Sequence, residues 1–68
     1  MWTKWYVYVR IEKNGEYVEH DGVLDVEAVN GPTPTARYVA DSVEASLFDA
    51  HPHLRGGRVT GKRARRVG

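Results

Sequence analysis

Residues 2–28 read WTKWYVYVRIEKNGEYVEHDGVLDVEA, and this stretch decides the fold of the chain. It consists of two runs in which apolar and polar residues alternate, joined by Asn14 and Gly15. Alternation of this kind predicts strands with one buried face. Asn-Gly favours a two-residue type I′ turn, because that turn needs positive φ at both of its central residues. The stretch therefore predicts one long β-hairpin.

The turn also fixes the register of the two strands. One face of the hairpin then becomes mostly apolar, whereas the other sets opposite charges directly across the strands, Arg10 opposite Glu19 and Lys4 opposite Asp25. Such pairs stabilise a sheet by roughly a few tenths of a kcal/mol each. The Asp-Gly pair at 21–22 offers a second possible turn, which would give a meander of shorter strands. That alternative loses the charge matching, so we favour the long hairpin.

A helix is expected after the hairpin. Turn-forming residues at 30–34, NGPTP, end the second strand. Thr33 is the expected N-cap, with Pro34 at the first helical position, where its missing N–H costs nothing. His51 and Pro52 are the expected stop. Between these ends, apolar residues recur at helical spacing and form a stripe suited to lying on a sheet. The stripe comprises Ala36, Val39, Ala40, Val43, Leu47 and Ala50.

A short third strand is expected over residues 58–61, with Val59 facing inward. A right-handed crossover sets this strand antiparallel beside the first, in the order 2-1-3. The predicted fold class is therefore α+β, a ββαβ arrangement with one helix on one face of a three-stranded antiparallel sheet. Residues 1–61 form the single domain and residues 62–68 a basic C-terminal tail. The predicted core comprises Trp5, Val7, Val9, Ile11, Val18, Leu24, Val26, Val39, Val43, Leu47 and Val59.

Length and composition limit the possible classes of protein. The chain has 68 residues, enough for one small core. It contains no cysteine, which excludes disulfides and the usual structural zinc sites and favours a reducing, cytoplasmic location. No apolar run approaches the roughly 18 residues of a membrane-spanning helix, and no signal peptide is recognisable at the start. We therefore expect a cytoplasmic protein.

Charge is divided unequally along the chain. Residues 1–54 hold four basic and nine acidic residues, a net charge of −5, whereas residues 55–68 hold six basic residues and no acidic one, a net charge of +6. Such asymmetry indicates contact with a polyanion. The leading hypothesis is a small non-enzymatic nucleic-acid-binding protein, for example DNA-binding, or a nucleic-acid-associated accessory protein. The residues expected to contact phosphates are Arg55, Arg58, Lys62, Arg63, Arg65 and Arg66.

The face of the hairpin without a helix carries several large apolar residues. A contiguous apolar face is unusual on a monomer and indicates a partner surface. The alternative hypothesis is a protein-interaction module, such as an adaptor, inhibitor or assembly component, and we expect a homodimer. The residues assigned to this interface are Trp2, Tyr6, Tyr8, Tyr17 and Val23.

Catalytic and metal-binding patterns are weak in this sequence. Catalysis requires a nucleophile, a base and an orienting group that converge, and no such set is identifiable. Asp49, His51 and His53 lie close together and offer ligands suited to zinc or nickel. A histidine-rich helix end is the commoner meaning of that pattern, and no fourth ligand is evident. We therefore expect neither an enzyme nor a bound cofactor or metal.

Overall fold

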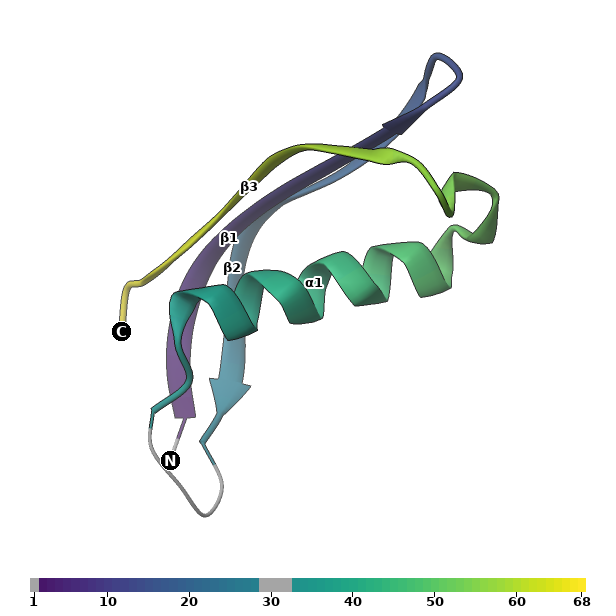
Figure 1. Cartoon of the computed structure of the whole chain (residues 1–68). Helices are drawn as coiled ribbons and strands as arrows, with labels where there is room; N and C mark the ends of the chain where they lie inside the picture. The colour runs from purple at the N-terminus through teal and green to yellow at the C-terminus, as the bar shows by residue number, and fades with distance from the viewer. Residues whose placement is uncertain (1, 29–32) are drawn as a thin grey trace.

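The chain folds as a three-stranded antiparallel sheet in the order β2-β1-β3, with one helix, α1, packed on one face (Figure 1). This computed structural model describes residues 2–28 and 33–68. It confirms the predicted α+β fold class and strand order. The predicted turn residues 30–32 lie outside the described residues. The elements are β1 (Trp2–Lys13), β2 (Glu16–Glu27), α1 (Ala36–Ala50), the 3₁₀ turn η1 (Pro52–Leu54) and β3 (Arg58–Arg66).

The β1–β2 hairpin forms over its full predicted length. Asn14 and Gly15 have φ angles of 52° and 82°, the positive values that a type I′ turn requires. The register is the predicted one, and Lys4 lies opposite Asp25 as expected. β2 continues without a break through Gly22. The alternative meander, with a turn at 21–22, is therefore wrong.

The N-cap of α1 is Thr35, and the prediction of Thr33 was wrong. The Thr35 hydroxyl accepts a hydrogen bond from the backbone N–H of Tyr38 at 3.1 Å. That bond satisfies one of the N–H groups left without a partner in the first turn of a helix. Both threonines flank Pro34 and carry the same hydroxyl, so local chemistry does not choose between them. At the other end, His51 is the C-cap, which confirms the predicted stop.

β3 extends to Arg66, so the prediction that this strand ends at Gly61 was wrong. Most of the expected basic tail is an edge strand paired with β1. The cause of the error is a β-bulge at Thr60, because Val59 lies opposite Ile11 and Gly61 lies opposite Arg10. The extra residue shifts the alternation of side chains by one. A period of two counted from Val59 therefore fails in the rest of the strand.

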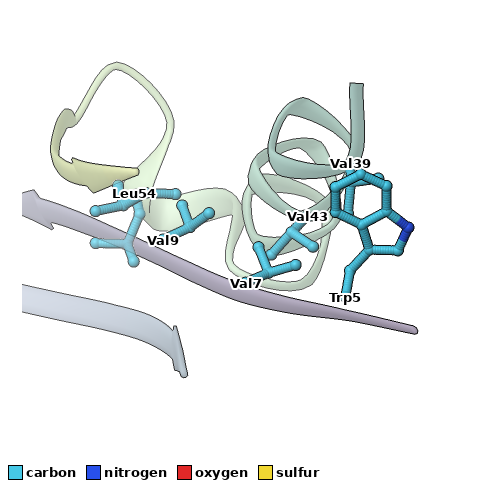
Figure 2. Packing of buried hydrophobic residues seen from close by; sticks show 7 residues of the cluster. Trp5, Val7, Val9, Val39, Val43 and Leu54 are labelled. Atoms are coloured by element: carbon cyan, nitrogen blue, oxygen red, sulfur yellow. The ribbon is translucent and has the colours of Figure 1, made fainter. Parts of the chain in front are cut away.

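The core lies between α1 and the face of β1 that holds the odd-numbered residues. Trp5 lies against Val39, Val7 against Val43, and Val9 beside Leu54 (Figure 2). Every residue of the predicted core is either buried or packed against the buried cluster. Sequence reasoning missed Leu54, which is 2% exposed because η1 turns it inward.

A buried polar residue closes the core near the start of β1. Thr3 is fully buried, and its hydroxyl donates to the Val26 carbonyl at 3.0 Å. The same hydroxyl accepts a hydrogen bond from the Trp5 indole N–H at 2.9 Å. Each polar atom of this group is thereby satisfied without water, as burial requires.

Replacing Leu54 by alanine tests whether η1 belongs to the core. Loss of a fully buried leucine side chain leaves a cavity and costs about 2–5 kcal/mol. Because small domains have a free energy of unfolding of only about 5–15 kcal/mol, Leu54→Ala is expected to lower the urea midpoint markedly. The control is Val23→Ala, at a side chain 59% exposed on the sheet. Similar midpoints for the two variants would contradict this account of the core.

Candidate binding surface on the open sheet face

The face of the sheet opposite α1, here called the open face, carries three columns of different chemistry. The even-numbered residues of β1 form a central column that contains Tyr6 and Tyr8. Beside it, the register of β3 sets a basic column on one side, and β2 sets an acidic column on the other. The basic column comprises Arg58, Arg63 and Arg65, and the acidic column comprises Glu19, Asp21, Asp25 and Glu27.

The two tyrosines connect the basic and acidic columns. The Arg63 guanidinium lies 5.2 Å from the centre of the Tyr8 ring, and the Tyr8 hydroxyl donates to Glu19 at 3.3 Å. Arg65 lies 5.7 Å from the centre of the Tyr6 ring, and the Tyr6 hydroxyl donates to Asp21 at 2.8 Å. Guanidinium groups at these distances are attracted to the ring face. Each row therefore runs from an arginine through a tyrosine to a carboxylate.

Glycine at position 61 makes room for one of these rows. A Cβ atom at Gly61 would lie 2.4 Å from Cε2 of Tyr8. The Tyr8 ring can therefore lean over β3 only because residue 61 has no side chain. This leaning also brings the ring next to Arg63, which is the next open-face residue of β3.

Other residues of the predicted protein interface remain exposed on the open face. Trp2, Tyr17 and Val23 are 65%, 57% and 59% exposed, whereas Tyr6 and Tyr8 are half-buried. Arg10 lies 4.1 Å from the centre of the Tyr17 ring and forms an ion pair with Glu19 at 3.6 Å. All five residues predicted for this interface thus lie on one face, although they differ in how much surface they offer.

The six basic residues predicted to contact phosphates do not share one face. Only Arg58, Arg63 and Arg65 face the open side. The guanidinium of Arg55 binds Asp49 at 3.1 Å, near the end of α1. Arg66 lies opposite Trp5, and its Nε donates to the Gly68 carbonyl at 3.1 Å.

Lys62 turns toward α1 and binds two carboxylates there. Its ammonium donates to Asp41 and lies 3.4 Å from Glu44. The hydrogen bond from Lys62 lowers the pKa of Asp41 below its ordinary value. The same hydrogen bond raises the pKa of Lys62, against the opposing effect of partial desolvation. Lys62 therefore ties β3 to the helix and is a poor ligand for phosphate.

Of the three possible metal ligands near the end of α1, Asp49 and His53 lie against charged side chains of other residues. The His51 and His53 rings lie 6.0 Å apart and meet edge to face. Asp49 binds Arg55, and Nε2 of His53 lies 3.5 Å from a carboxylate oxygen of Glu16. Within residues 2–28 and 33–68, no three or more His, Asp or Glu side chains gather as metal ligands would.

Sequence reasoning found the columns of β1 and β2 but not the basic column of β3. The missing signal was the inward position of Ala64, which is partly buried and packs on the core. Because Ala64 follows Val59 by an odd number of positions, five, both can face inward only if one extra residue is inserted between them. That parity indicates the bulge, and it sends Arg63 and Arg65 to the open face.

Comparison of the chain with models of protein families, with curated proteins and with solved structures gives no match. Among the residues that the structure describes, no helix has the length and apolar character needed to cross a membrane. The functional argument therefore depends on the geometry of the chain itself.

The ion pair between Lys62 and Asp41 predicts a pH dependence of stability. Folding lowers the pKa of Asp41. The contribution of Asp41 to the free energy of unfolding is therefore complete above a pH of about 3.9, the ordinary aspartate pKa, and it is lost as the pH falls through the folded-state pKa. Lys62→Met is therefore expected to lower the urea midpoint at pH 7, and to lower it less as the pH falls below about 4.

A double-mutant cycle with Asp41→Asn isolates this pair from other charges. The coupling free energy between the two substitutions should be measurable at pH 7 and should be smaller at a pH below about 4. A coupling that is the same at both pH values would exclude Asp41 as the titrating partner.

Proposed function

We propose that this chain is a small non-enzymatic, nucleic-acid-associated accessory protein that acts in the cytoplasm and binds phosphates along β3. The observation that carries the proposal is the basic column Arg58, Arg63 and Arg65 beside two tyrosines on the open face. Arginine suits this role because its planar guanidinium binds phosphate oxygens through two parallel hydrogen bonds.

The acidic column of β2 restricts where a nucleic acid can lie. β2 and β3 are separated by two strand spacings, about 10 Å. The Debye length at physiological ionic strength is about 8 Å, so salt screens most of the repulsion between the acidic column and a phosphate at β3. The attraction between a phosphate and the guanidinium of Arg63 or Arg65 in direct contact with it is not screened in this way. The nucleic-acid backbone is therefore expected to follow the β3 edge and not to cross the sheet.

The chemistry of the surface favours binding that tolerates sequence changes. The arginines offer contacts to phosphates, and the rings of Tyr6 and Tyr8 already pack against arginine and bind carboxylates. Contacts to phosphates position a protein without reading bases. The expected mode is thus weak, sensitive to salt and directed to single strands or duplex backbone alike.

The salt dependence of binding tests this proposal. Fluorescence anisotropy with a 20-nucleotide DNA strand should detect binding at low salt, and log K should fall linearly with log[salt]. Each phosphate contact on a single strand contributes about 0.7 to the slope. Arg63→Gln with Arg65→Gln is therefore expected to reduce the slope by about 1.4. RNA and duplex DNA of the same length show whether the strand type matters.

The matched control is Arg37→Gln with Arg55→Gln, which removes the same charge from residues off the open face. These two arginines form ion pairs with Asp41 and Asp49. If the control reduces the slope as much as the first pair, binding follows net charge and the assigned site is wrong. No binding of any of the probes at low salt would remove the proposal altogether.

A second candidate function, a protein-interaction module that forms a homodimer, has one specific observation in its favour. The open face places exposed Trp2, Tyr17 and Val23 among columns of opposite charge. Two copies related by a twofold axis parallel to the strands would set the acidic column of each over the basic column of the other. A twofold axis perpendicular to the strands and in the plane of the sheet would set like charges together. The charge pattern of the open face therefore favours a dimer whose axis is parallel to the strands.

Sedimentation velocity at rising protein concentration tests this second function. Trp2→Glu with Val23→Glu should shift the protein to monomer, because it removes apolar surface and adds charge to the face. Tyr38→Glu is the control, since Tyr38 is 61% exposed on α1. A wild-type chain that stays monomeric at millimolar concentration, or a dimer that only the control disrupts, would exclude the open face as the interface.

A further inference from the structure

A groove lies on the other side of the sheet, where α1 leaves β2 partly uncovered. The helix packs mainly on β3 and β1. On β1 the inward residues Val7, Val9 and Ile11 are fully buried, whereas Leu24 and Val26 on β2 are only partly buried.

The groove has a volume of about 440 Å³. One wall comes from β2 and the other from α1. The lining includes His20, Leu24 and Val26 on β2, and Ser42, Ser46 and Leu47 on α1.

The floor of this groove ends at the outer edge of β2. β2 is an edge strand, paired only with β1 among the described elements. Because the two-residue turn makes Lys13 and Glu16 a hydrogen-bonded pair, the even-numbered residues of β2 bond to β1. The odd-numbered residues then direct their N–H and C=O groups away from the sheet. This edge can accept a further strand.

The side chains along that edge define what such a strand must carry. The odd-numbered residues of β2 that are charged are all acidic, and their side chains lie on the open face. A residue placed opposite one of them would have its side chain on the same face, so a basic residue is favoured there. The residues between these would face the groove, where Leu24 and Val26 favour apolar side chains.

We propose that the β2 edge binds an extended segment of a partner protein in which basic and apolar residues alternate. The segment adds a fourth strand, directs its apolar side chains into the groove beneath α1 and sets its basic side chains against the acidic column. Main-chain hydrogen bonds supply affinity in such complexes, and the alternate side chains supply specificity. This inference is independent of phosphate binding at β3, on the opposite edge of the sheet.

Two other occupants fit the observations less well. A second copy of this chain paired through β2 would set acidic residues against acidic residues along the whole edge, because Glu19, Asp21, Asp25 and Glu27 all face the same side. An amphipathic helix in the groove would leave the backbone of the edge unpaired and would not contact the acidic column. An added strand uses the groove, the edge and the charges together.

The probe for this test is an eight-residue peptide, capped at both ends, of alternating lysine and valine. Titration into the ¹⁵N-labelled chain should shift the amides of β2 and of Ser42 and Ser46 saturably. A peptide of the same composition with its lysines and valines in separate blocks is the control, and it should bind at least tenfold more weakly. Equal binding of the two peptides, or shifts that avoid β2, would overturn the proposal.

Two variants at Val23 test the role of the edge backbone. The Val23 N–H points away from β1, so Val23→Pro removes an outward donor without breaking a bond of the hairpin. Val23→Ala truncates the side chain but keeps that donor. We expect Val23→Pro to weaken peptide binding at least tenfold and Val23→Ala to leave it nearly unchanged. Unaltered binding to Val23→Pro, with the hairpin intact by NMR, would overturn the proposal.

A charge exchange tests the role of the acidic column. Asp25→Lys with Glu27→Lys should weaken binding of the lysine–valine peptide at least tenfold and should permit binding of a glutamate–valine peptide. Failure of this exchange would show that the acidic column does not select the partner. Preferential binding of a helix-forming peptide, or dimerisation abolished by Val23→Pro, would assign the groove to a different occupant and overturn the proposal.

Peptide binding and nucleic-acid binding can be separated with the variants already described. Arg63→Gln with Arg65→Gln should leave peptide binding unchanged, because both residues lie at the opposite edge. Loss of peptide binding in that variant, with the fold intact, would contradict a site at β2.

Discussion

The turn at Asn14 and Gly15 is the constraint on which the rest of the structure depends. Its two positive φ angles fix the hairpin register, and a slip of one residue would reverse the faces of β2 relative to β1. Leu24 and Val26 would then leave the core side, and the cross-strand charge pairs would be lost. The separation of a core face from an open face therefore follows from two adjacent residues.

The bulge at Thr60 is the second constraint, and it determines where the basic residues lie. Without the extra residue, Arg63 and Arg65 would face α1, while Lys62 and Ala64 would lie on the open face. The bulge instead brings Ala64 against the core and Lys62 within reach of Asp41. One backbone irregularity thus provides an apolar contact, an ion pair to the helix and a basic column beside the tyrosines.

The strand order was predicted from the handedness of the crossover, whereas local signals were sufficient to predict the hairpin, its register and the helix. Each of these depends on neighbouring residues, such as a turn, a periodic stripe or a proline stop. The length of β3 was not predictable in that way, because its backbone is stabilised by pairing with β1 and its own apolar content is low. Leu54 was missed for a similar reason, since a single leucine in a short turn has no periodicity.

The candidate site was predictable only where it depended on the hairpin. The interface residues of β1 and β2 were placed on one face by the register alone, and the structure has them there. The six basic residues, in contrast, were grouped by their position in the chain. Charge that is contiguous in sequence becomes divided among opposite faces once the segment is a strand. Arg55 and Lys62 are also bound by carboxylates of α1, and the partner of Lys62, Asp41, lies 21 residues away in the chain.

The sheet has an acidic edge at β2 and a basic edge at β3. Copies of the chain could therefore assemble head to tail, with β3 of one copy added to the β2 edge of the next. β3 of one copy would meet the acidic column of another with Arg63 and Arg65, which is favourable. Its other face, however, carries Lys62 and Arg66 beside Ala64 and would bring both charges to an apolar groove. Burying those charges without partners costs roughly several kcal/mol. Moving Lys62 into the groove of another copy would also break its hydrogen bonds to Asp41 and Glu44 on α1.

The bulge further twists the β3 edge away from a flat partner. The β2 edge and its groove therefore favour a segment with one basic face and one apolar face. They disfavour β3 of a second copy of this chain, because both faces of β3 carry basic residues.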